Sequence, residues 1–103
     1  MYCLFFSGGW ILQSYFAGSL NITSNFSTAG STDQNCDIVA SNPSDTKQLW
    51  FIDITASPSI YQIRSMANPT VALDLRGASS ANDTPVTAYP VGNQDNQKWA
   101  FVK

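Results

Sequence analysis

Short runs of β-branched and aromatic residues alternate along the chain with clusters of Gly, Pro, Asn, Asp and Ser. Good helix formers other than Ala are scarce, so the pattern favours strands and turns over helices. Eight such runs follow one another at a spacing of roughly twelve residues, which is typical of an all-β sandwich or barrel. The predicted strands cover residues 10–13, 19–23, 37–40, 49–54, 60–64, 71–75, 85–89 and 98–102.

The first residues of the chain are also apolar, from Met1 to Phe6. No basic residue precedes this run, it is shorter than the core of a secretory signal, and no clear small-residue cleavage site follows it. It is therefore predicted to be a further strand.

Three sequence matches, in the same order, indicate an internal repeat. They pair residues 48–50 with 97–99, 10–12 with 61–63, and 20–22 with 73–75. The first match is Gln48-Leu49-Trp50 against Gln97-Lys98-Trp99, a shift of 49 residues. Residues 10–54 and 60–103 are thus predicted to be two similar units of four strands each, the first of them degenerate.

The paired Gln-x-Trp motif and the second unit as a whole resemble the ricin B-type lectin family. The matching stretch runs from Tyr61-Gln62-Ile63 through residues 73–77 to Gln97-Lys98-Trp99. In that family three four-stranded units form a β-trefoil, and each unit closes with a core Trp and a Gln that ties strand to turn. The second unit is more similar to fungal members than to plant toxins, whose repeats carry paired cysteines that this chain lacks.

The resemblance implies that residues 1–103 form one all-β domain, an incomplete β-trefoil with two of three units. Residues 1–9 would then supply the last strand of a missing unit. Two units would leave an open sheet and an uncovered face of the core, and such surfaces promote association. We therefore expect several copies of the chain to associate and complete the trefoil.

The resemblance also implies a shallow sugar site in the second unit. In the family an Asp accepts hydrogen bonds from two adjacent hydroxyls, an aromatic ring stacks on the pyranose, and a polar pair precedes the closing Trp. Carried over, these roles fall on Asp74, on Tyr89, and on Asn96 and Gln97. Thr87 stands two residues before Tyr89, on the same strand face, and is expected to line the pocket.

Each of these residues also has a purely structural interpretation. Asp74 alternates with two leucines and fits the solvent side of a strand, while Tyr89 could shield the core at a strand end. Asn96 could cap a turn, and Gln97 belongs to the structural motif. In the first unit Asn21 is matched to the carboxylate position and Ala40 falls near the aromatic one, so that unit is expected to be a scaffold without a sugar site.

Composition excludes several classes of function. His is absent and all seven acidic residues are Asp, so catalysis or metal binding through His is impossible. Five basic residues against seven acidic ones argue against a nucleic-acid groove. The sequence contains no run of 18 apolar residues, so no membrane-spanning helix is predicted. We expect a binding module that is not an enzyme and needs no cofactor or metal.

The sequence therefore predicts a lectin for glycans that contain galactose or N-acetylgalactosamine. A β-trefoil protease inhibitor acting through a loop such as Ser24–Asn35 is the alternative, and a targeting lobe of a larger toxin or glycosidase is a third. The absence of a visible signal favours the cytoplasm, whereas the three sequons at Asn21, Asn25 and Asn82 would matter only in a secreted protein. Cys3 and Cys36 permit one disulfide but do not require it.

Overall fold

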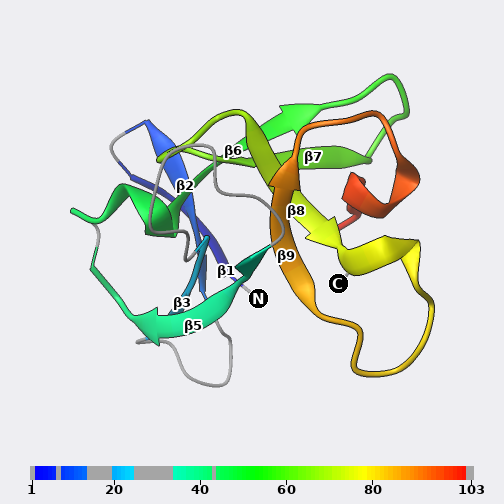
Figure 1. Ribbon diagram of the computed structural model, residues 1–103. Coiled ribbons are helices and arrows are strands. Elements are labelled where there is room, and N and C mark those ends of the chain that lie inside the picture. The colour runs from blue at the N-terminus through cyan, green and yellow to red at the C-terminus, as the bar shows by residue number, and fades with distance from the viewer. Residues whose placement is uncertain (1, 7, 14–19, 25–33, 43, 102–103) are drawn as a thin grey trace.

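Strands and short 3₁₀ turns make up the regular structure of the described part of the chain (Figure 1). A computed structural model describes residues 2–6, 8–13, 20–24, 34–42 and 44–101. The strands are β1 (Tyr2–Phe6), β2 (Gly9–Gln13), β3 (Leu20–Thr23), β4 (Gln34–Asn35), β5 (Asp37–Ala40), β6 (Leu49–Ile54), β7 (Tyr61–Ser65), β8 (Val71–Leu75) and β9 (Val86–Pro90). The turns are η1 (Thr46–Gln48), η2 (Arg76–Ala78) and η3 (Asp95–Gln97). No helix in these described ranges is long and apolar enough to cross a membrane.

Most of the predicted strands are confirmed, including the one at the start of the chain. The prediction of a strand over 98–102 is wrong for its described part, because Trp99 forms only an isolated bridge with Tyr61. The two residues exchange both backbone hydrogen bonds at 2.8 Å, and no longer ladder continues from them among the described residues. The two-residue strand β4 is not predicted, because two polar residues show no alternation of apolar and polar positions.

The strands form one antiparallel sheet in the order β4-β9-β8-β7-β6-β2-β3-β5, and β1 pairs with β2 outside this path. The two ends of the path, β4 and β5, are consecutive strands separated only by Cys36. The Cys36 amide donates to the Val86 carbonyl at 2.8 Å. Residues 34–40 thus bond to β9 on one side and to β3 on the other, so the sheet curls back on itself through this segment.

The core is formed by side chains from β2, β6, β7 and β8. Leu12, Trp50, Ile63 and Leu73 are buried together, and Trp99 packs partly buried against them. Truncating a buried Trp to Ala costs about 3–5 kcal/mol, so the fully buried Trp50 is a major source of stability. The predicted place of Trp50 in the core is confirmed, whereas Trp99 is only partly buried against the core cluster.

The indole hydrogen bonds give the true correspondence between the two units. Trp50 Nε1 donates to the Ile22 carbonyl at 3.2 Å, and Trp99 Nε1 donates to the Leu73 carbonyl at 3.1 Å. Ile22 is therefore the counterpart of Leu73, and the counterpart of Asp74 is Thr23. The sequence match of 20–22 with 73–75 is wrong by two residues, because chemical likeness between short strands does not fix their register.

Candidate functional site

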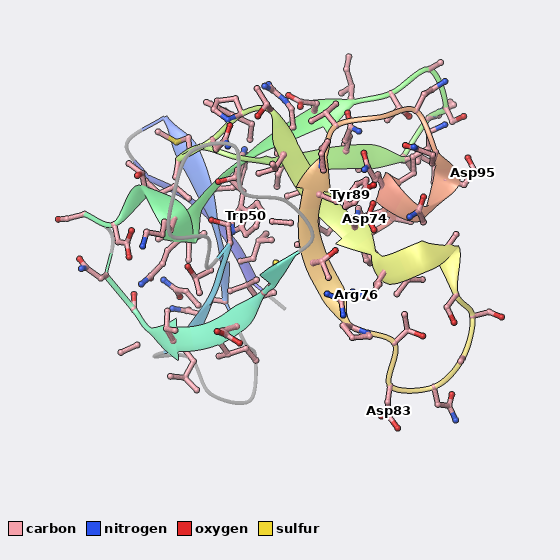
Figure 2. The ribbon with its side chains drawn as sticks, in the orientation of Figure 1. Trp50, Asp74, Arg76, Asp83, Tyr89 and Asp95 are labelled. Atoms are coloured by element: carbon pink, nitrogen blue, oxygen red, sulfur yellow. The ribbon has the colours of Figure 1, made fainter. Side chains whose placement is uncertain are left out.

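A hollow of about 420 Å³ lies beside the ends of β8 and β9, between η2 and η3. Figure 2 shows Asp74 and Tyr89 close together in this region, with Asp95 pointing outward and Asp83 at the tip of a distant loop. The hollow is lined by Asp74, Arg76, Gly77, Ala78, Tyr89, Gln94 and Asn96.

Gln97 holds the base of this region together. Its side chain is fully buried, and its Nε2 donates to Asp74 Oδ2 at 2.9 Å and to the Pro90 carbonyl at 2.8 Å. Its Oε1 accepts from the Gly92 amide at 2.9 Å and from Gln62 Nε2 at 3.1 Å. Both amide hydrogens and both lone pairs of Gln97 are thereby engaged within the protein. The structural role expected of this motif residue is confirmed, and the structure does not bring it to the hollow's lining.

Asp74 lies at the wall of the hollow with only 4% of its surface exposed. Its Oδ1 accepts from Asn96 Nδ2 at 3.2 Å, and its Oδ2 accepts from Gln97 Nε2. These two donors orient the carboxylate and compensate for much of its desolvation. An ionised carboxylate has about four acceptor positions, so Asp74 retains further positions for hydroxyl donors. The prediction of a solvent-facing Asp74 is wrong.

Asn96 donates both of its side-chain amide hydrogens to groups within the protein. Besides Asp74, its Nδ2 donates to the Leu75 carbonyl at 3.0 Å. A ligand in the hollow would therefore meet Asn96 through its carbonyl oxygen, as an acceptor. Asn96 thus fixes Asp74 and also presents an acceptor at the same wall.

Among the described residues that line the hollow, Tyr89 supplies the one aromatic ring, and it is 41% exposed. Thr87, which the sequence places on the same face of β9, is fully buried and does not line the hollow. In the sheet it lies between its register partners Asp74 on β8 and Asn35 on β4, and its Oγ1 donates to the Asp74 carbonyl at 3.4 Å.

Sequence reasoning missed the polar residues Arg76 and Gln94 of the lining. Arg76 stands two residues after Asp74, and the alternation along β8 could have placed it on the same side. The turn η2, which follows β8, contains Gly77 at φ 62° and Ala78 at φ 53°. This left-handed backbone folds η2 back against the hollow and is unusual for Ala.

The first unit repeats the scaffold without the site chemistry. Gln48 is buried like Gln97, and its Nε2 donates to the Ala40 carbonyl at 3.1 Å, as that of Gln97 does to Pro90. Thr23 and Val39 therefore stand where the second unit has Asp74 and Tyr89. The match of Asn21 to the carboxylate position is wrong, because the strand register places Thr23 there. Asn21 is buried and donates to Gln48 Oε1 at 3.0 Å. The first unit thus lacks both the carboxylate and the ring.

Other polar groups give no second centre of this kind. In the part of the chain that the structure describes, no group of three or more Cys, Asp or Glu side chains could hold a metal ion. Arg64 pairs with Asp53, whose hydrogen bond raises the pKa of the guanidinium. Cys36 is a free thiol. Its burial, and to a smaller extent the nearby Asp37, raises its pKa to about 12. Most of the predicted inhibitor loop, residues 25–33, lies outside the described residues.

Comparisons with known proteins agree with this architecture. A family model described as "Ricin-type beta-trefoil lectin domain-like" matches residues 7–89 and, in a second alignment, residues 46–103. No curated protein sequence matches the chain.

Three solved structures show the same fold at low sequence identity. A mosquitocidal holotoxin gives a TM-score of 0.83 at 18% identity, over 95% of this chain and 12% of that chain. ThreeFoil, a designed 3-fold symmetric protein, gives 0.76 at 21% identity, over 97% and 68%. The PSL1a–E64 complex gives 0.72 at 23% identity, over 87% and 32%. The chain therefore spans only a small part of the holotoxin and about a third of PSL1a.

Proposed function

Because the chain belongs to the ricin-type β-trefoil lectin domain-like family, we propose that it is a carbohydrate-binding module without catalytic activity of its own. The fold is all-β and of the β-trefoil type, in the incomplete form expected from the sequence. We place the sugar in the hollow lined by Asp74, Tyr89 and Asn96, and we propose galactose or N-acetylgalactosamine as its terminal residue.

The arrangement of Asp74 carries this proposal. Its carboxylate is held in place by Asn96 and Gln97 at the wall of an open hollow. A fixed carboxylate can accept hydrogen bonds from two neighbouring hydroxyls of one sugar, and such charge-assisted bonds are stronger than neutral ones. The carbonyl oxygen of Asn96 adds a third acceptor at the same wall.

Tyr89 adds the apolar half of the site. Galactose has an axial O4, which leaves one flank of its ring mainly C–H, and a flat aromatic ring suits such a flank. Burying roughly 50 Å² of apolar surface against Tyr89 would contribute about 1 kcal/mol. A shallow site of this kind binds weakly, with a dissociation constant on the order of 0.1–1 mM, and gains strength only through several linked sites.

Retention on a galactose resin, with elution by lactose, tests the proposal. Tyr89→Ala is the informative variant, because it removes the stacking ring and leaves the hydrogen bonds of Asp74 in place. Val91→Ala is the matched control, since Val91 is also 41% exposed and does not line the hollow. The parent and Val91→Ala are expected to be retained, and Tyr89→Ala is expected to flow through.

Two results would count against this site. Retention of Tyr89→Ala equal to that of the parent would move the sugar elsewhere on the protein. Absence of retention for a folded parent, together with inhibition of a protease in a panel of serine and cysteine proteases, would favour the alternative of a β-trefoil protease inhibitor that acts through residues 24–35.

A further inference from the structure

The turn side of the sugar hollow carries two features that the proposed contacts with Asp74 and Tyr89 do not use. One is the side chain of Gln94, directly before η3, and the other is Ala78, the last residue of η2. Both residues line the hollow, and η2 and η3 lie against each other. A sugar in the hollow would therefore meet these two residues as well as the carboxylate and the ring.

The side-chain amide of Gln94 lies over the backbone of Gly92, in the space that a side chain at residue 92 would fill. A Cβ on Gly92 would lie 2.7 Å from Cδ and 2.9 Å from Nε2 of Gln94, which is closer than real Cβ atoms approach. The Gly92 backbone is itself fixed, because its amide donates to Gln97 Oε1 and its carbonyl accepts from Gln62 Nε2, each at 2.9 Å. The Gln94 amide thus rests on a firmly held segment at the wall of the hollow.

Gln94 supplies a donor beside a wall that presents acceptors. The carboxylate of Asp74 only accepts, and Asn96 donates both side-chain amide hydrogens to groups within the protein. Arg76, another nitrogen donor of the lining, takes part in an interaction within the protein. The side-chain amide of Gln94 has no hydrogen-bond partner in the described part of the chain, so both of its hydrogens can serve a ligand.

Ala78 adds an apolar contact from an unusual backbone conformation. Its φ of 53° lies in the left-handed region, which costs free energy for any residue with a Cβ. Residues held in such conformations are found preferentially at ligand and active sites. Among the described lining residues Ala78 has the one aliphatic side chain, a methyl group. The turn side of the hollow therefore combines an amide donor with a methyl contact.

We propose that Gln94 and Ala78 recognise the N-acetyl group of the sugar, so that the hollow prefers N-acetylgalactosamine to galactose. An acetamido group combines a carbonyl oxygen, which accepts a hydrogen bond from Gln94 Nε2, with a methyl group that packs against Ala78. Galactose has a hydroxyl at the same carbon and lacks both the carbonyl and the methyl. This inference rests on the proposed sugar site and names the feature of the ligand that the site selects.

Two methyl glycosides that differ only at C2 test this inference, methyl α-galactoside and methyl N-acetyl-α-galactosaminide, each titrated into the folded parent by calorimetry or NMR. One neutral hydrogen bond and one buried methyl together predict about tenfold tighter binding of the acetamido sugar. Gln94→Met keeps the length of the side chain and removes its donor. Ala78→Gly removes the methyl and relieves the left-handed strain, so this variant is expected to fold. Each variant should reduce the tenfold ratio to about threefold or less and leave the affinity for the galactoside nearly unchanged.

Gly92→Ala tests the position of the Gln94 amide without changing Gln94 itself. The new Cβ would occupy the place of the flexible end of that side chain and displace it. The ratio between the two glycosides should then fall as it does for Gln94→Met. Asn93→Ala is the matched control, because Asn93 is an exposed neighbour outside the lining, and it should keep the ratio of the parent.

The outcomes separate this inference from the proposed function. Equal affinity of the parent for the two glycosides overturns the inference and leaves the sugar site in place. A preference that survives in both Gln94→Met and Ala78→Gly overturns it as well, because the N-acetyl group would then be recognised elsewhere. A folded parent that binds neither glycoside overturns the proposed function, and this inference with it.

Discussion

The side-chain amide of Gln97 donates a 2.9 Å hydrogen bond to the carboxylate of Asp74, 23 residues earlier in the chain. The bond is buried and connects a structural motif residue with the proposed sugar acceptor. Asp74 therefore contributes both to the proposed site and to the stability of the fold, so substitutions of Asp74 change stability as well as binding.

Asp74→Ala is expected to destabilise the protein. Removing the carboxylate leaves one buried N–H of Gln97 and one of Asn96 without an acceptor, and a buried unsatisfied donor costs about 1–3 kcal/mol. We expect the free energy of unfolding, measured by urea denaturation, to fall by about 2 kcal/mol. An unchanged midpoint and slope would contradict the buried bond between Asp74 and Gln97.

The two motif glutamines are expected to matter equally for the fold. Gln48→Ala and Gln97→Ala each remove a buried amide that joins a strand to a turn, and each should lower the free energy of unfolding by about 2–4 kcal/mol. The exposed Gln94 is the control, because Gln94→Ala should change stability by less than about 0.5 kcal/mol. A loss at Gln97 with none at Gln48 would contradict the equivalence of the two units.

Asn96→Asp would place a second carboxylate at hydrogen-bond distance from Asp74, where Asn96 Nδ2 now lies at 3.2 Å. Two carboxylates that close cannot both be ionised without cost, so one of the two pKa values rises in the folded variant. The folded state then binds more protons than the unfolded state above the ordinary carboxyl pKa, and stability falls as the pH rises through that range.

The parent has an amide at this position and provides the control. The difference in unfolding midpoint between the parent and Asn96→Asp should be small near pH 4 and larger near pH 7, as measured by thermal denaturation at several pH values. A difference that is the same at every pH would show that the two side chains do not face each other.

Much of the fold could be predicted from the sequence because its signals are local. Alternation and turn residues locate most strands, and the Gln-x-Trp pair identifies the two core tryptophans with their tethering glutamines. The pairing register of the strands could not be predicted in this way, because it depends on contacts between residues that are distant in the sequence. Only the bonds from Trp50 to Ile22 and from Trp99 to Leu73 show that Thr23, not Asn21, corresponds to Asp74.

The candidate site was predictable only in part, for the same reason. Asp74, Tyr89 and Asn96 line one hollow, whereas Thr87 is buried and pairs with β4, a strand that the sequence does not reveal. Arg76 and Gln94 reach the hollow because η2 and η3 fold back beside it. Turns with residues in the left-handed region place side chains in ways that strand alternation cannot anticipate.

Cys36 is expected to react slowly with thiol reagents. Its pKa of about 12, against an ordinary value of 9.0, lowers the fraction of thiolate near neutral pH about a thousandfold. In a Cys3→Ser background, labelling of the native protein should be slower than labelling in urea by roughly this factor and should speed up as the pH rises toward 12. Equal rates in native and unfolded protein would contradict the burial of the thiol.

Whether a sugar occupies the hollow of the second unit can be measured by an amide-resolved NMR titration with lactose. We expect saturable shifts at the backbone amides of Gly77, Ala78, Gln94 and Asn96, with none at Thr23 or Val39 of the first unit. The expected dissociation constant is on the order of 0.1–1 mM, and Tyr89→Ala should abolish the shifts. Shifts confined to the first unit, or none at millimolar lactose in a well-folded sample, would exclude a sugar in this hollow.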